Sequence, residues 1–124
     1  MTDKTATVKE LKDKVQKFCE DRDWDQFHNA KDLAIGISTE ASELLDLFRF
    51  KSQDDIDKMM QDPTKRERIG EELADVIYFT FRFAQRFNFD ISEELDKKLR
   101  KNNEKYPIEK AKGSNKKYDE CKNV

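Results

Sequence analysis

The sequence predicts an all-α protein, a bundle of four long helices that assembles as a dimer or a dimer of dimers. Apolar residues recur at spacings of three and four in four segments, which is the spacing of one helix face. No segment shows the alternation of apolar and polar residues that a half-buried strand requires. From Leu73 to Ala84 one predicted helix is apolar on nearly every side, so it needs more covering surface than one small chain supplies.

Composition limits what the chain can do. Of its 124 residues, 42% are charged and 35% hydrophobic, and the formal net charge is -2. Generic binding to duplex nucleic acid needs a basic excess, so this composition argues against that class. No apolar signal segment opens the sequence and no apolar run reaches membrane-spanning length, so we expect a cytoplasmic protein with no membrane contact. Cys19 and Cys121 lack metal-ligand spacing, and free thiols are the simpler interpretation.

The first predicted helix starts at a Thr5 or Thr7 cap and runs to about Arg22. Its apolar face consists of Val8, Leu11, Val15 and Phe18. Residues 23–29 interrupt the helical spacing and form a loop, which holds the only Trp and the only His of the chain. Judged on residue type alone, Trp24 and Phe27 are packing aromatics that close one end of a helical core.

The second predicted helix covers residues 30–50 and carries two stripes. The broad apolar face consists of Leu33, Ala34, Ile37, Ala41, Leu44, Leu45 and Phe48. The stripe beside it consists of Gly36, Glu40, Glu43, Leu47 and Phe50. Acids that share a stripe with large apolar groups are not typical of a solvated surface. Gly36 would let another group approach the helix backbone closely.

A short helix opens at Ser52 and ends at Asp62-Pro63, and the third long helix then covers residues 64–87. The main apolar face of this long helix consists of Ile69, Leu73, Val76, Ile77, Thr80, Phe83, Ala84 and Phe87. A second stripe consists of Arg68, Glu72, Asp75, Phe79, Arg82 and Arg86. The two arginines on that stripe either hold phosphates as forked donors or pair with nearby acids.

The fourth long helix opens at Ser92, with Glu93 or Glu94 nearby, and runs to about Lys105 before Pro107. Its narrow apolar stripe consists of Ile91, Leu95 and Leu99. We place the domain boundary here, with residues 1–107 as an all-α domain and residues 108–124 as a basic C-terminal tail. The tail is either a disordered solubilising segment or a basic flap that touches phosphates.

Two acidic pairs carry the candidate chemistry. Glu40 and Glu43 lie three residues apart, as do Glu72 and Asp75, so each pair lies on one side of its helix. If the two stripes face each other, four carboxylates converge and need a counter-charge. Oxygen ligands alone favour Mg²⁺ or Mn²⁺, which also accept phosphate oxygens and activate water.

Two other interpretations of these acids compete with the metal site. Taken alone, each pair is more often a solvated helix face, and it is the shared stripes with Phe and Leu that favour a metal. Di-iron helical bundles require Glu-x-x-His on two helices, whereas His28 lies in a loop, so we reject that class.

Four ordered motifs of this chain resemble those of a known family. They are Arg22-Asp23-Trp24-Asp25-Gln26-Phe27-His28, Glu40-Ala41-Ser42-Glu43-Leu44-Leu45-Asp46-Leu47-Phe48, Glu71-Glu72-Leu73-Ala74-Asp75-Val76, and a C-terminal set of Asn102, Tyr106-Pro107, Gly113-Ser114 and Lys117-Tyr118. Together they resemble the MazG-like all-α nucleoside triphosphate pyrophosphohydrolases, and among these most closely the dCTP pyrophosphatase branch. The resemblance covers nearly the whole chain.

This resemblance implies Mg²⁺-dependent hydrolysis of a dNTP to the monophosphate and pyrophosphate. It implies that the metal is held by the catalytic acids Glu40, Glu43, Glu72 and Asp75. It implies that the nucleotide pocket is lined by Trp24, Asp25, Gln26, Phe27, His28, Phe50 and Phe79. Known members often have Trp at position 50 and Tyr at position 79, so Phe keeps a stacking surface but loses a polar group, which leaves the choice of base open.

Our mechanistic hypothesis adds a phosphate-neutralising set and a water-orienting acid. The phosphates would be neutralised by Lys98 and Asn102, with Lys31 or an arginine of the third long helix. Glu40 is the candidate that orients the attacking water. One competing hypothesis is a non-catalytic helical interaction protein that uses its apolar third helix. Another is an NTPase that acts on a damaged or modified nucleotide.

Overall fold

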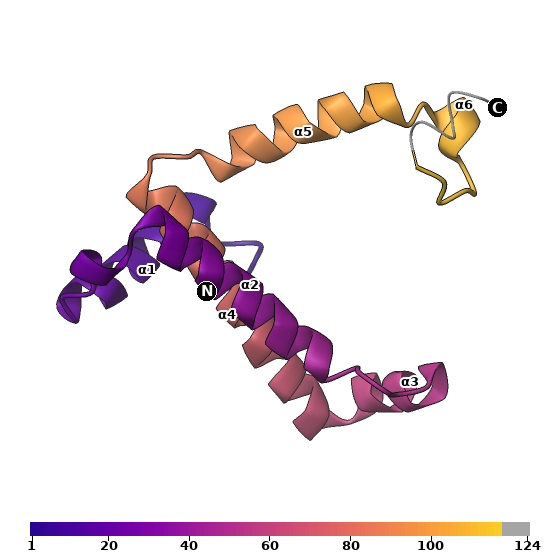
Figure 1. Ribbon diagram of the computed structural model, residues 1–124, viewed down its shortest axis with the longest axis horizontal. Coiled ribbons are helices and arrows are strands. Elements are labelled where there is room, and N and C mark those ends of the chain that lie inside the picture. Colours follow the sequence, from indigo (N-terminus) through magenta and orange to yellow (C-terminus); the bar gives the residue numbers. More distant parts are fainter. Residues whose placement is uncertain (118–124) are drawn as a thin grey trace. The chain divides into compact units, whose positions relative to one another are not determined.

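The computed structural model describes residues 1–117 and shows an all-α fold, as predicted (Figure 1). This part of the chain contains no strand. Its elements are α1 (Val8–Asp21), the 3-10 turn η1 (Asp25–Phe27), α2 (Ala30–Asp46), α3 (Gln53–Gln61), α4 (Pro63–Arg86), α5 (Ile91–Lys105) and α6 (Ile108–Ala111). The four long helices predicted from the sequence are α1, α2, α4 and α5, and the predicted short helix is α3. Among residues 1–117, no helix is long and apolar enough to cross a membrane.

The chain divides into two compact units. The first contains residues Met1–Asn88, and the second begins at Phe89 and contains α5 and α6. The predicted tail opens with the short helix α6, which the sequence analysis did not anticipate. Tyr118 of the C-terminal motif and Cys121 of the thiol prediction lie outside the described residues.

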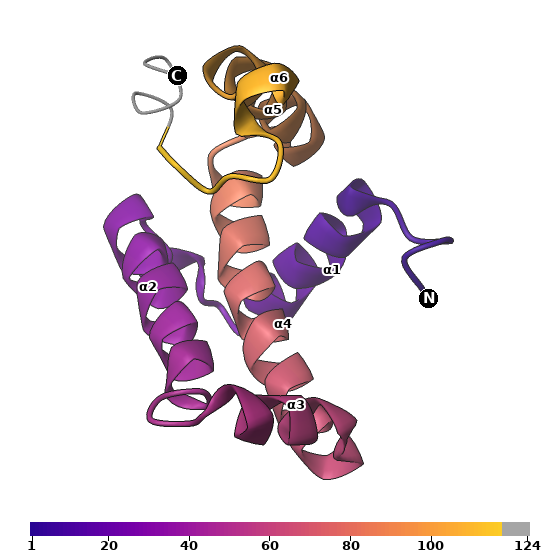
Figure 2. The same ribbon diagram turned by 90° about the vertical axis from the view of Figure 1, so that its right-hand side faces the viewer.

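The first unit is organised around α4, which contacts α1, α2 and α3 (Figures 1 and 2). Asp62 ends α3 and also caps α4, where its side chain accepts hydrogen bonds from the backbone N–H groups of Thr64 and Lys65. Pro63 occupies the first helical position, where its missing N–H costs nothing. This junction fixes the start of the helix that carries Glu72 and Asp75.

The other helix starts follow from capping side chains. Thr7 accepts a hydrogen bond from the Glu10 N–H at 3.1 Å, so Thr7 rather than Thr5 caps α1. The prediction that Ser92 opens α5 is wrong. Asp90 is the cap and accepts a hydrogen bond from the Glu93 N–H at 2.9 Å, which leaves Ser92 inside the first turn.

The second long helix is shorter than predicted, because α2 ends at Asp46 and not at residue 50. After Asp46 the helical winding becomes tighter, because the N–H of Phe48 donates a hydrogen bond to the carbonyl of Leu45, three residues earlier. Ser52 then opens α3 with a capping box. Phe50 lies in the connection with a φ of 62° and is 92% exposed. Phe50 therefore lies outside the helical stripe of Glu40 and Glu43. The prediction that Phe50 continues this stripe is wrong.

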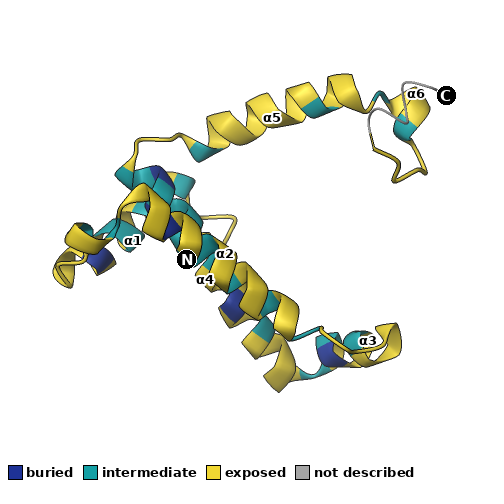
Figure 3. Cartoon of the chain, viewed as in Figure 1, coloured by how far each residue is buried: buried dark blue, intermediate teal, exposed yellow. Residues whose placement is uncertain are grey.

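Burial varies along α4 (Figure 3). Its three buried residues are Glu72 and Arg82 of the mixed stripe and Ala84 of the main apolar face. Arg82 is fully buried and Glu72 is 7% exposed, whereas Leu73 is 52% exposed and Ile77 is 43% exposed. Within the first unit, the helix thus buries members of its mixed stripe and leaves part of its main apolar face open. This arrangement brings the acids of α4 toward α2. Part of the apolar face of α4 stays exposed, and its coverage by another subunit stays a prediction.

Candidate metal centre

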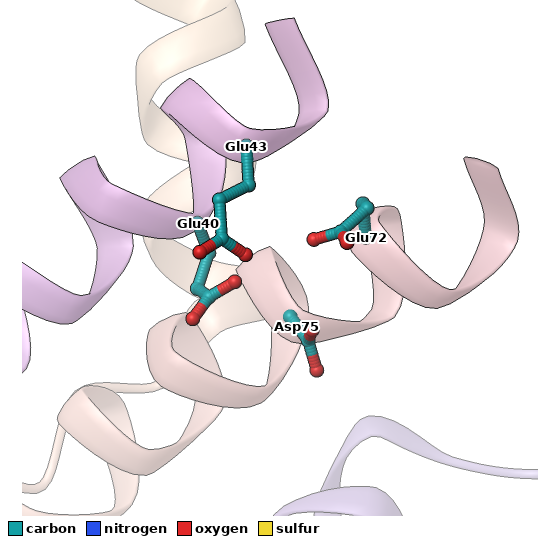
Figure 4. Close-up of side chains that lie close together, drawn as sticks. All are labelled: Glu40, Glu43, Glu72 and Asp75. Atoms are coloured by element: carbon teal, nitrogen blue, oxygen red, sulfur yellow. The ribbon is translucent and has the colours of Figure 1, made fainter. Parts of the chain in front are cut away.

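Four carboxylates from two helices converge in the first unit. Glu40 and Glu43 extend from α2, and Glu72 and Asp75 extend from α4 (Figure 4). One carboxylate oxygen of each residue lies within 4.8 Å of the corresponding oxygens of the other three. The sequence prediction that the two acidic pairs face each other is confirmed. Because each pair spans one helical turn, the packing of α2 on α4 is enough to assemble the cluster.

The cluster is partly removed from water. Glu72 is buried and Glu40 is half-buried, while Glu43 and Asp75 are exposed. Arg68 Nε donates a hydrogen bond to Glu72 Oε1 at 3.1 Å. Within the described residues, Glu40 Oε2 and Glu72 Oε2 are buried without a hydrogen-bond partner. A buried carboxylate oxygen without a donor is costly, so these two atoms are suited to a cation.

The electrostatics of Glu40 point the same way. Its pKa is raised from 4.5 to about 7, first by a hydrogen bond between its carboxyl group and Glu43, and then by burial. Repulsion from Glu43, Asp75 and Glu72 raises the pKa further. Without a cation, the burial of Glu40 and the repulsion from its neighbouring carboxylates therefore favour the protonated form of Glu40. Four oxygen ligands with excess negative charge fit Mg²⁺ or Mn²⁺.

A close helix contact lies one turn from the acids. Gly36 precedes Glu40 by four residues on α2, and Phe79 follows Asp75 by four residues on α4. A Cβ atom added to Gly36 would lie 2.5 Å from Cδ1 of Phe79. The Phe79 ring also meets the Tyr78 ring nearly edge-on, with 5.0 Å between centroids. The predicted close approach at Gly36 is confirmed, and the group that approaches is a predicted pocket residue.

The turn between α1 and α2 is tied to α4 by arginines. Arg82 donates hydrogen bonds from Nε to His28 Nδ1 at 2.9 Å, from one terminal nitrogen to Gln85, and from the other to Asp25. Arg86 Nη1 lies 3.7 Å from Asp25 Oδ2. Of the two roles considered for these arginines, the structure shows ion pairing. The sequence did not identify Asp25 as the acidic partner of these arginines. The available signal was that Arg82 and Arg86 share a stripe with Asp75 and Phe79, which are predicted site residues.

These contacts shift two ionisation equilibria in the turn. The hydrogen bond from Arg82 lowers the pKa of Asp25, against a smaller opposing effect of burial. The pKa of His28 is lowered by burial first and then by the positive charge of Arg82. Asp25 is therefore held as a carboxylate, and His28 is held as a neutral imidazole near pH 7.

Two aromatic residues of the turn keep exposed surface. Trp24 is 37% exposed and contacts the Phe18 ring edge-on, with 5.7 Å between centroids, and the His28 ring at 6.1 Å. Phe27 is 60% exposed. Gln26 donates a hydrogen bond from Nε2 to the carbonyl of Asp23 at 3.0 Å. Trp24 thus packs on one side, as the packing interpretation predicts, and keeps part of its surface exposed.

The remaining predicted binding residues lie elsewhere. Lys31 is exposed in the first turn of α2, and Phe50 lies in the connection to α3. Lys98 and Asn102 belong to α5 in the second unit. Their participation in one site with the acids stays a prediction.

The chain resembles known proteins over most of its length. Residues 35–121 match the sequence profile of the MazG-like family. The chain is 30% identical to dCTP pyrophosphatase 1 of Mus musculus over 112 residues, which cover 90% of this chain and 66% of that protein. It is also 30% identical to dCTP pyrophosphatase 1 of Homo sapiens, over 92% of this chain and 67% of that protein. The chain thus spans just under two thirds of the mouse protein.

A solved structure shows the same fold. A pyrophosphatase from Archaeoglobus fulgidus superimposes with a TM-score of 0.75 and 31% sequence identity. The match covers 81% of this chain and 92% of the archaeal chain.

Proposed function

The chain belongs to the MazG-like family, and from this premise we propose that it hydrolyses a deoxynucleoside triphosphate, dCTP or a related dNTP, to the monophosphate and pyrophosphate with Mg²⁺. The observation that carries the proposal is the cluster of four carboxylate oxygens within 4.8 Å of one another. The similarity to dCTP pyrophosphatase 1 of mouse and human and to the archaeal pyrophosphatase supports it. Such an activity removes unwanted nucleotides from the cellular pool.

In this mechanism the four acids share one role, and Glu40 has a second. Glu40, Glu43, Glu72 and Asp75 would hold the metal, with Mn²⁺ as an alternative to Mg²⁺. When bound, the metal supplies the positive charge that neutralises the triphosphate and favours ionisation of the attacking water. Glu40 would orient that water and can accept its proton at a carboxylate oxygen. The water attacks the α-phosphorus, the bond to the bridging oxygen breaks, and pyrophosphate leaves.

The nucleotide end of the site uses aromatic surface. In the proposal, Trp24, Phe50 and Phe79 supply stacking faces for the base. In the same proposal, Lys31, Lys98 and Asn102 neutralise the phosphates. The partly exposed apolar face of α4, with Leu73 and Ile77, supports self-association into a dimer or tetramer.

The test is release of pyrophosphate from the four dNTPs and four NTPs, each with Mg²⁺ and with excess EDTA. We expect pyrophosphate and a monophosphate from at least one dNTP, and none in EDTA. Equal rates with and without EDTA, or phosphate as the sole inorganic product, would contradict the mechanism. Modified dNTPs in the same assay address hydrolysis of damaged nucleotides.

The exposed Leu73 and Ile77 also favour a second candidate, a non-catalytic helical protein that binds a partner through α4. A melting scan separates the two functions, because a ligand that binds only the folded state raises the melting temperature. The enzyme should be stabilised by Mg²⁺ with a nucleotide, by about 2.7 kcal/mol at a ligand concentration of 100 times Kd. The interaction protein should show no such shift.

A further inference from the structure

The buried guanidinium of Arg82 connects the two halves of the proposed site. Arg82 is fully buried on α4. It lies seven residues after Asp75, which is two turns or about 10 Å along the helix. Arg82 donates hydrogen bonds to Asp25, His28 and Gln85, and we term these four residues the Arg82 network. Two of these partners belong to the turn that presents Trp24 and Phe27.

The network fixes the chemical form of His28. Arginine carries only donors and keeps its charge, so the nitrogen that Arg82 Nε contacts at 2.9 Å must be an acceptor. That nitrogen is Nδ1, so a neutral imidazole carries its proton on Nε2. The charged groups that face the ring are Arg82 and Arg86 of α4 and Asp25 of η1. Protonating Nδ1 would place two donors against each other beside a buried cation.

We infer that Arg82 is a positioning residue that sets His28 as a permanent Nε2–H donor and anchors the Asp25–Phe27 turn on the helix of the metal ligands. The inference rests on the proposed function for the identity of the ligand. The ligand group that fits this donor is an acceptor atom of the nucleobase or of the deoxyribose. A donor that holds no charge near neutral pH discriminates between bases by hydrogen bonding and leaves the phosphates to the lysines.

The imidazole and indole signals can be assigned without ambiguity, because the chain has one His and one Trp. In ¹⁵N-labelled protein the imidazole nitrogens of His28 give a single pair of signals, and Trp24 fluorescence reports binding. At pH 7.5 we expect an unprotonated Nδ1 and a protonated Nε2. A protonated Nδ1, or a mixture of both tautomers, would overturn the inference, whatever the hydrolytic activity.

Ligand contact is tested without turnover by titrating the four dNMPs. The Nε2–H resonance should shift with at least one dNMP that also changes Trp24 fluorescence. Fluorescence changes with no effect on Nε2–H for any dNMP would overturn the ligand-facing role of His28. If no dNTP is hydrolysed while tautomer and dNMP contact are as expected, the proposed reaction fails and the role of Arg82 stands.

Arg82→Lys tests the positioning role, since lysine keeps the charge and loses the fork. We expect mixed His28 tautomers and a rise in KM of at least about tenfold, with kcat and Mn²⁺ affinity in the absence of nucleotide little changed. Arg66→Lys on the exposed part of α4 is the matched control and should match the parent protein. If Arg82→Lys does not fold, Asp25→Asn tests the same network with a smaller change. Unaltered tautomer and KM in the folded variant would refute the positioning role.

Discussion

The Phe79 ring lies directly on the backbone of Gly36, so closely that a Cβ atom on Gly36 would lie 2.5 Å from Phe79 Cδ1. Glycine is required here by contact with another helix and not by its backbone angles. The contact lies one turn from Glu40 on α2 and one turn from Asp75 on α4. The separation of the two helices beside the acids therefore depends on a missing methyl group.

Gly36→Ala should destabilise the protein and weaken metal binding. The added methyl forces Phe79 or the helices to move, and overpacking costs about 1–3 kcal/mol. Gly70→Ala on α4 is the matched control, because a Cβ there meets nothing within 4 Å and alanine favours a helix. We expect Gly36→Ala to be less stable than Gly70→Ala by about 1–3 kcal/mol in urea unfolding. Equal stability would show that the contact does not set the helix spacing.

Substitution of Glu43 or Asp75 should abolish turnover without unfolding the chain. Both side chains are exposed, so Glu43→Gln and Asp75→Asn remove a ligand charge at little structural cost. Pyrophosphate release should fall by at least about 100-fold, since changes even in the outer shell of metal sites cost about 10- to 100-fold. Far-UV circular dichroism checks the fold, and Glu67→Gln, at an exposed position of α4 outside the cluster, should keep activity. Full activity in both acid variants would exclude the cluster from catalysis.

Stability of the metal-free protein should depend on pH through Glu40. The folded-state pKa of about 7 lies above the ordinary value of 4.5, so folding favours the protonated form. This contribution is fully present below pH 4.5 and is lost as the pH rises through 7. In EDTA, the melting temperature of the parent protein should therefore fall relative to Glu40→Gln between pH 5.5 and pH 8.

His28 acts in the opposite direction over part of that range, because its pKa is lowered and stability is lost as the pH falls below 6.5. Comparing the parent protein with Glu40→Gln removes this effect, since both contain His28. Saturating Mg²⁺ should also abolish the difference in pH dependence. A constant difference in melting temperature across the range would mean that Glu40 ionises normally.

Ile77→Glu should disrupt self-association. Ile77 is 43% exposed beside Leu73 on α4, so a charge there would be buried by any subunit that covers this face. We expect a smaller assembly by sedimentation or light scattering. Ile108→Glu, at a 76% exposed position of α6, is the control for adding a charge at an exposed isoleucine. An unchanged assembly in Ile77→Glu would place the interface elsewhere.

The local architecture could be predicted from the amino-acid sequence. Apolar spacing located the four long helices, since a helix face repeats every three to four residues wherever the helix packs. It also placed Glu40 with Glu43 and Glu72 with Asp75, because a three-residue spacing has only one geometry on a helix. The requirement for glycine at position 36 was visible as well, although its partner Phe79 was not.

Contacts between different elements could not be predicted from the spacing of residues in the sequence. Helical periodicity predicted that Phe50 continues the stripe of Glu43, but α2 ends at Asp46 and Phe50 lies exposed in the connection before the capping box of Ser52. Helical periodicity also identified the most apolar face of α4, but α2 packs on the mixed stripe, where Arg82 is buried and donates hydrogen bonds to Asp25 and His28. A buried charge is stable only with its partners, and those partners lie more than fifty residues away in sequence, where spacing carries no information.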